Sequence, residues 1–147
     1  MRFTVVTPVS GIPVEIFQKF QRPLLEALVP PWAKITIHRF DGSVKGDKIE
    51  LNVKLLGLID QAWENLVTEN FESDRECFFV DEGTKMPFPV TFWKHKHRII
   101  GLKSGSEIRD EIEFHCNSIF LEWIMFPVVW IQFVWRKPIY KKVFGGN

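Results

Sequence analysis

A long apolar run near the end of the chain restricts the possible fold more than any other stretch. It reads IFLEWIMFPVVWIQFVW from Ile119 to Trp135, and only Glu122, Pro127 and Gln132 interrupt it. The run is close to the minimum of about 17 residues that a membrane-spanning helix needs, and an acidic residue inside a bilayer costs on the order of 3 kcal/mol. Because the rest of the chain reads as a complete soluble domain, we expect no transmembrane segment and interpret the run as a core helix.

The helix proper is expected to begin at Pro127, because proline is tolerated in the first turn of a helix and not in its interior. Apolar residues occur nearly all round this helix, whereas a helix that only covers a solvated sheet has a polar back. We therefore expect either a deep cavity beneath the helix or a second apolar surface against it. A homodimer through the C-terminal helix is the common form of such a surface.

The composition indicates a single domain over residues 1–147. Hydrophobic residues make up 46% of the chain and charged residues 25%, both ordinary for a globular protein. Lys and Arg number 19 against 18 for Asp and Glu, so the basic excess that favours nucleic acid or an anionic membrane is absent. The two cysteines form no disulfide framework or zinc pattern, and the N-terminal residues form no secretory signal, so we expect a cytoplasmic protein.

An antiparallel meander is predicted between the first residues and the apolar run. RFTVVTPV reads as a strand, and PVEIFQKFQRPLLEALVP reads as two short helices that begin near Pro13 and Pro23. Six more strands follow: AKITIHRF, KIELNVKL, DQAWENLVTENF, RECFFV, VTFWKHKHRII and SEIRDEIEFHC. One sheet of about seven strands cannot bury an apolar face alone, so the C-terminal helix must form the second layer. A strongly curved sheet wrapped on this helix leaves a space between them, which predicts an α+β fold with a central cavity.

The hairpin from Val90 to Cys116 places polar residues on an apolar face. Alternation predicts the inner-face residues Trp93, His95, His97, Ile99, Ile108, Asp110, Ile112, Phe114 and Cys116. A two-residue turn at Lys103-Ser104 would set His97 opposite Asp110. A buried carboxylate without a partner costs several kcal/mol, so we predict that one of the two histidines contacts Asp110.

Four interpretations of this polar group remain open. His97 or His95 satisfies Asp110 structurally, or one of these groups also orients a ligand in an apolar pocket. A His–Asp pair could instead act in acid–base catalysis. A metal site could use His95 and His97 with Asp110 as a third ligand. Nothing else in the sequence indicates a complete coordination sphere, so no metal, no cofactor and no catalytic residue is assigned.

Several local motifs carry a resemblance to a known family. They are WENLVTE, FFVDEG before a proline-containing turn, FWKHKHRI, EIRDEIEF and FVWRKPIYKKVF. On these motifs, and on the order of elements over essentially the whole chain, the sequence resembles the SRPBCC superfamily, also called START-like or helix-grip proteins, and in particular its small bacterial ligand-binding members. The resemblance implies a helix-grip fold with a cavity. It implies no reaction, because none of these motifs is a catalytic signature.

The expected function is the binding of a small hydrophobic or amphipathic ligand, such as a lipid, an isoprenoid or an aromatic compound. The predicted site residues are Trp63, Trp93, His95, His97, Asp110, Ile112, Phe114, Ile131 and Trp135. The apolar members would exclude water, while Asp110, His97 and His95 would orient the ligand. One alternative is a polyketide cyclase-like or dehydratase-like enzyme that uses a His–Asp pair. The other is a protein-interaction module with a filled core.

Overall fold

The computed structural model describes residues 1–146, which form a seven-stranded antiparallel sheet and four helices. The strands are β1 Arg2–Val9, β2 Ala33–Phe40, β3 Lys48–Leu55, β4 Ile59–Glu72, β5 Glu76–Lys85, β6 Val90–Gly101 and β7 Ser106–Cys116. The helices are α1 Pro13–Gln18, α2 Arg22–Ala27, α3 Ile119–Val134 and α4 Arg136–Phe144. This confirms the predicted α+β helix-grip architecture, with two short helices between the first two strands.

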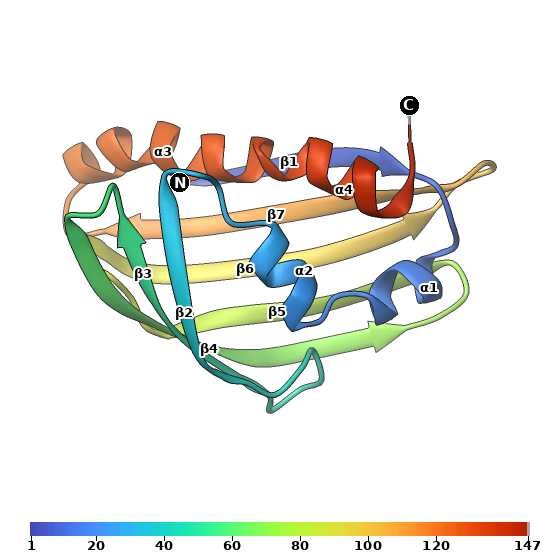
Figure 1. Cartoon of the computed structure of the whole chain (residues 1–147), viewed down its shortest axis with the longest axis horizontal. Helices are drawn as coiled ribbons and strands as arrows, with labels where there is room; N and C mark the ends of the chain where they lie inside the picture. The colour runs from blue at the N-terminus through green and yellow to red at the C-terminus, as the bar shows by residue number, and fades with distance from the viewer. Residues whose placement is uncertain (147) are drawn as a thin grey trace.

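The strands lie in the order β1-β7-β6-β5-β4-β3-β2. Figure 1 shows α3 and α4 nearly end to end along one side of the curved sheet, beside β1 and β7. Helix α1 packs against β5 and β6 in the middle of the sheet. Helices α1 and α2 and the C-terminal helices α3 and α4 therefore all lie on one face of the sheet (Figure 1).

The C-terminal helix begins earlier than the sequence indicated. Its first residue is Ile119 rather than Pro127, and Pro127 lies inside α3. The Ser118 side chain accepts a hydrogen bond from the Leu121 N–H at 3.3 Å and so caps the first turn, as serine commonly does. Proline inside a helix costs about 3 kcal/mol. Packing on both sides of the proline offsets this cost, because Leu121 before it and Phe133 after it contact the same core cluster.

Two apolar clusters divide the core. One joins α1 and α2 to α4, and the other joins α3 to β1, β6 and β7. On β6, Ile99 belongs to the first cluster and Trp93 to the second, while His95 and His97 lie between them. Along α3 and α4, Arg136 lies between Phe133 of the second cluster and Tyr140 of the first, and it is also buried. Polar residues therefore separate the two halves of the core.

The outer face of the C-terminal helix is apolar and exposed. Trp123 is 67% exposed, Trp130 43% and Ile131 45%. The segment Ile119–Phe144 is long and apolar enough to cross a membrane, and 22% of its most apolar 18-residue stretch is buried. Core helices of soluble proteins can have the same length and composition. The inner face of this helix is packed on the sheet.

Candidate functional site

The hairpin of β6 and β7 has the predicted register, with His97 opposite Asp110. The two-residue turn is closed by a hydrogen bond from the Leu102 N–H to the Gly105 carbonyl at 3.0 Å. Gly105 has a φ of +76°, and a Cβ there would lie 2.5 Å from the Val9 carbonyl oxygen. Only glycine fits this position without strain, so the turn helps to set the register that brings the polar side chains together.

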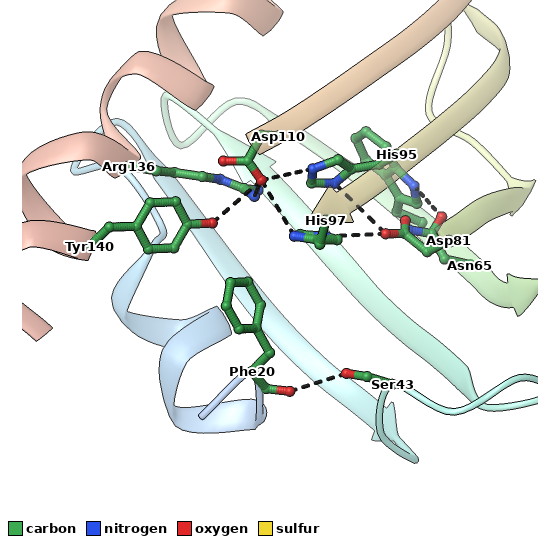
Figure 2. A network of polar contacts seen from close by, with 10 residues as sticks. Phe20, Ser43, Asn65, Asp81, His95, His97, Asp110, Arg136 and Tyr140 are labelled. Atoms are coloured by element: carbon green, nitrogen blue, oxygen red, sulfur yellow. Dashed lines mark hydrogen bonds and ion pairs between the residues drawn. The ribbon is translucent and has the colours of Figure 1, made fainter. Parts of the chain in front are cut away.

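Asp110 is buried at the centre of the polar contacts (Figure 2). Its Oδ1 lies 2.9 Å from His95 Nε2 and 3.4 Å from His97 Nδ1. The Tyr140 hydroxyl donates to the same oxygen at 3.4 Å, and Arg136 Nη1 is 3.7 Å away. Both histidines therefore contact Asp110, as the sequence predicted for at least one of them.

Asp81 is a second buried carboxylate that the sequence analysis missed. Its Oδ2 lies 3.3 Å from His97 Nε2 and 3.7 Å from His95 Nδ1. The Asn65 amide donates to its Oδ1 at 2.5 Å, and the Trp63 indole N–H donates to the Asn65 Oδ1 at 2.8 Å. The two histidines thus lie between two aspartates (Figure 2).

Asp81 was missed because the predicted strand ended at Val80, whereas β5 continues to Lys85. The sequence after Val80 is charged and contains Gly83, which is typical of a loop. Alternation from Cys77 and Phe79 would have placed Asp81 on the inner face. Arg136 and Tyr140 were also missed, although both follow Phe133 at the spacing of one helix face.

We call the seven connected polar residues the polar layer: Asn65, Asp81, His95, His97, Asp110, Arg136 and Tyr140. Burial alone would raise the pKa of both aspartates, but hydrogen bonds from the histidines and the nearby positive charges hold each pKa below its usual value. Burial and the neighbouring His97 lower the pKa of His95 to about 4. Burial also acts to lower the pKa of His97, but its contacts with Asp110 and Asp81 outweigh this and raise it. The layer therefore favours the neutral form of His95 and stabilises the protonated form of His97 between the two carboxylates.

A cavity of about 140 Å³ lies against the polar layer. Apolar side chains of α2, β2 and β3 form part of its wall, and the predicted site residues Trp63, Trp93, His95 and His97 also line it. The Ser43 hydroxyl donates to the Phe20 carbonyl at 3.1 Å and ties the loop after β2 to the short helices at the cavity edge (Figure 2).

The C-terminal helix presents a different face to the cavity from the one predicted. Gln132, Phe133 and Arg136 line the cavity, whereas Ile131 is 45% exposed and Trp135 is 37% exposed. The Trp135 ring packs instead on Trp32, with centroids 5.4 Å apart. Because this helix is apolar on nearly every side, its periodicity could not single out the inner face.

Three other predicted site residues lie behind the cavity wall. Ile112 and Phe114 are buried in the cluster that joins α3 to the sheet. Asp110 is 1% exposed and does not line the cavity, but it contacts His95 and His97, which do. Within residues 1–146, these three therefore support the site rather than line it.

Comparison with solved structures identifies the fold. Protein CV1439 from Chromobacterium violaceum aligns with a TM-score of 0.71 at 13% identity, over 99% of this chain and 98% of that chain. A truncated norcoclaurine synthase from Thalictrum flavum aligns with a TM-score of 0.66 at 16% identity, over 100% of this chain and 95% of that chain. The di-domain ARO/CYC StfQ from the steffimycin biosynthetic pathway aligns with a TM-score of 0.68 at 8% identity, over 99% of this chain and 52% of that chain.

These matches show that the chain shares the helix-grip fold of these proteins. No family model and no curated protein sequence matches the chain. At such low identities the likeness concerns the fold alone, and the function has to be argued from the site.

Proposed function

We propose that the protein binds a small amphipathic ligand, with an apolar body in the cavity and a polar group against the polar layer. The observation that carries this proposal is an apolar cavity with a largely buried polar wall formed by Asp81, His95, His97 and Arg136. Apolar pockets with a few convergent polar groups are the usual form of small-molecule sites. The free space beside the polar layer also favours ligand binding over an interaction module with a filled core.

The size of the cavity favours an aromatic or short-chain ligand over a long lipid or isoprenoid. A volume of about 140 Å³ is close to that of an engineered cavity of about 150 Å³ that holds benzene. Typical drug-sized sites enclose about 300–1,000 Å³. One or two fused rings fill this space, whereas a long chain would have to project past α2 and the loop after β2.

Apolar burial alone would give only weak affinity. A ligand body that buries about 200 Å² of apolar surface gains about 5 kcal/mol at 25 cal/mol per Å². Association costs at least about 4 kcal/mol. Tight binding therefore requires polar contacts, which His97 and Arg136 would offer to an anionic or hydroxyl group.

A cavity-filling substitution tests this proposal. Val53 lines the cavity from β3, so Val53→Trp should occupy the space and weaken binding of the fluorescent probe 2-naphthol at least about tenfold, because the cavity holds little more than one ring system. Lys54→Trp adds the same side chain on the opposite face of the strand and should leave the binding constant unchanged. Fluorescence titration measures both constants, and circular dichroism checks that both variants fold.

Equal binding by the wild type and Val53→Trp would place the probe outside the cavity and refute the site. Mass spectrometry of small molecules that copurify with the gently isolated protein would identify the natural ligand class. A ligand too long for the cavity would contradict the size argument while leaving the binding proposal intact.

A cyclase-like enzyme is the second candidate. His95 and His97 line the cavity and each contacts buried carboxylates, which is an arrangement suited to proton transfer. A norcoclaurine synthase and an ARO/CYC protein share the fold. Turnover of a bound polyketide-like substrate that His97→Gln abolishes, without loss of substrate binding, would establish this alternative.

We also propose that the chain forms a homodimer through the outer face of the C-terminal helix and works in the cytoplasm. The exposed Trp123, Trp130 and Ile131 support a protein contact. Helices that lie on membranes are instead rich in Lys and Arg on their polar face, and none occurs between Ile119 and Trp135. Cys77 and Cys116 are both buried free thiols, which fits a reducing compartment.

Sedimentation velocity tests the homodimer. The wild type should sediment as a dimer at high micromolar concentration, and Trp123→Glu should shift it to monomer because a charge would be buried in an apolar contact. Leu58→Glu makes a similar change at the 86% exposed Leu58 and should leave the dimer intact. A monomeric wild type would contradict the homodimer, and recovery of the wild type only with membranes would also contradict a cytoplasmic location.

A further inference from the structure

Three side chains of the polar layer converge as metal ligands do. Asp81, His95 and His97 each offer one ligand atom, and these atoms lie within 4.8 Å of one another. Asp81 Oδ2 is 3.3 Å from His97 Nε2 and 3.7 Å from His95 Nδ1. In a tetrahedral zinc site with bonds of about 2.0–2.1 Å, ligand atoms are about 3.3 Å apart. We propose that Asp81, His95 and His97 bind one divalent transition-metal ion.

The polar atoms of these three residues that would not bind the metal lie next to other polar side chains. His95 Nε2 contacts Asp110 at 2.9 Å, and His97 Nδ1 lies 3.4 Å from the same carboxylate. Asn65 donates to Asp81 Oδ1 and leaves Oδ2 directed at the histidines. Metal-binding histidines almost always donate their second N–H to a carboxylate or carbonyl, and metal-binding carboxylates are themselves hydrogen-bonded. Asp110 would therefore be a positioning residue that holds both imidazoles in the ligating orientation.

The donor set limits which ions are suitable. Two imidazoles and one carboxylate suit Zn²⁺ and Fe²⁺, whereas Ca²⁺ and Mg²⁺ prefer sets made of oxygen alone. Asp81 and Asp110 together offset the charge of a dication in a buried site, where an uncompensated charge would be costly.

The metal would keep one position open toward the cavity. Asp81, His95 and His97 all line the cavity, and three protein ligands with a free fourth position are characteristic of catalytic rather than structural zinc sites. This step rests on the proposed ligand binding: the metal would take a carboxylate, phenolate or carbonyl oxygen of the amphipathic ligand. Binding of the metal itself requires no organic ligand, so the two proposals can be tested apart.

The test is a calorimetric Zn²⁺ titration of the protein after removal of metal with a chelator. The wild type should bind one ion per chain. The isosteric Asp81→Asn and the variant His97→Gln should each bind more than about 100-fold more weakly, because each removes one of three ligands. Asp110→Asn should weaken binding by about 10- to 100-fold, as loss of a carboxylate that orients metal-binding histidines does.

The chain offers a matched control, because its 4 histidines are His38, His95, His97 and His115. His38 and His115 are exposed, so the double variant His38→Ala/His115→Ala should retain the affinity of the wild type. Loss of binding in this variant, with retention in Asp81→Asn, would overturn the proposal and assign the ion to the surface. A wild type that binds no zinc would also overturn it, and 2-naphthol uptake without zinc would then show that the cavity functions alone.

A measurement on the wild type covers the case in which the buried variants do not fold. Nitrogen-15 NMR of the imidazole rings should show zinc shifting Nδ1 of His95 and Nε2 of His97 and leaving the other nitrogen of each ring protonated. Ring signals of these two histidines that zinc does not change would overturn the site.

Discussion

Replacing Asp110 by alanine is expected to lower the free energy of unfolding by about 3–5 kcal/mol, because it removes one partner from a buried charge cluster. The carboxylate is 1% exposed and contacts His95, His97, Tyr140 and Arg136 through Oδ1. Without it, the buried Arg136 would keep its charge with a more distant carboxylate as its partner. Urea denaturation monitored by circular dichroism measures the loss.

Two further variants test whether the loss comes from the charge of Asp110 and from its buried position. Asp110→Asn keeps the size and an acceptor oxygen and should be less harmful than Asp110→Ala. Glu111→Ala, on the next and outward-facing residue, should change stability by no more than about 0.5 kcal/mol. An Asp110→Ala loss below about 1 kcal/mol would contradict a buried charge cluster.

The effect of Asp110→Ala should also depend on pH. The contacts of the carboxylate hold its folded-state pKa below the ordinary value of 3.8, so its stabilising contribution is present above that value and declines as the pH falls below it. The difference in stability between the wild type and Asp110→Ala should therefore shrink in acid. A difference that grew on acidification would mean that the pKa is raised instead.

Phe133→Ala is expected to destabilise the protein by about 3–5 kcal/mol, as loss of a large buried ring does. Phe133 is 1% exposed, and its ring stacks on Trp93 and meets the His95 ring edge to face. The guanidinium of Arg136 lies over the same ring, 4.1 Å from its centroid. Thermal and urea unfolding would measure the loss.

Ile131→Ala is the matched control, two residues before Phe133 on the outer side of the helix. Because Ile131 is 45% exposed, its truncation should change the free energy of unfolding by less than about 1 kcal/mol. The measurement belongs at low protein concentration, where a dimer contact would not contribute. A larger loss for Ile131→Ala than for Phe133→Ala would mean that the helix turns the face predicted from the sequence toward the core.

Strand alternation made the hairpin half of the site predictable. A period of two residues leaves only two choices of face, and the apolar residues around His95, His97 and Asp110 decided between them. The glycine turn then set the register, so the contact between the histidines and Asp110 followed from local sequence. The same reasoning would have found Asp81 had the strand been extended past Val80, but the charged residues beyond it concealed the continuation.

Three features could be predicted from local sequence: the order of the strands and short helices, the inner face of each hairpin strand, and the need for an apolar helix over the sheet. These follow from chain-local periodicity, because alternation and helical spacing are set by backbone geometry. Only packing against the sheet shows which side of the C-terminal helix faces inward, since nearly every side of that helix is apolar. Tertiary structure also decided that Asp81 and Arg136 join the histidines. Their convergence depends on the pairing of β5 with β6 and on the placement of the helix across the sheet, and periodicity predicts the face on which a residue lies but not these long-range pairings.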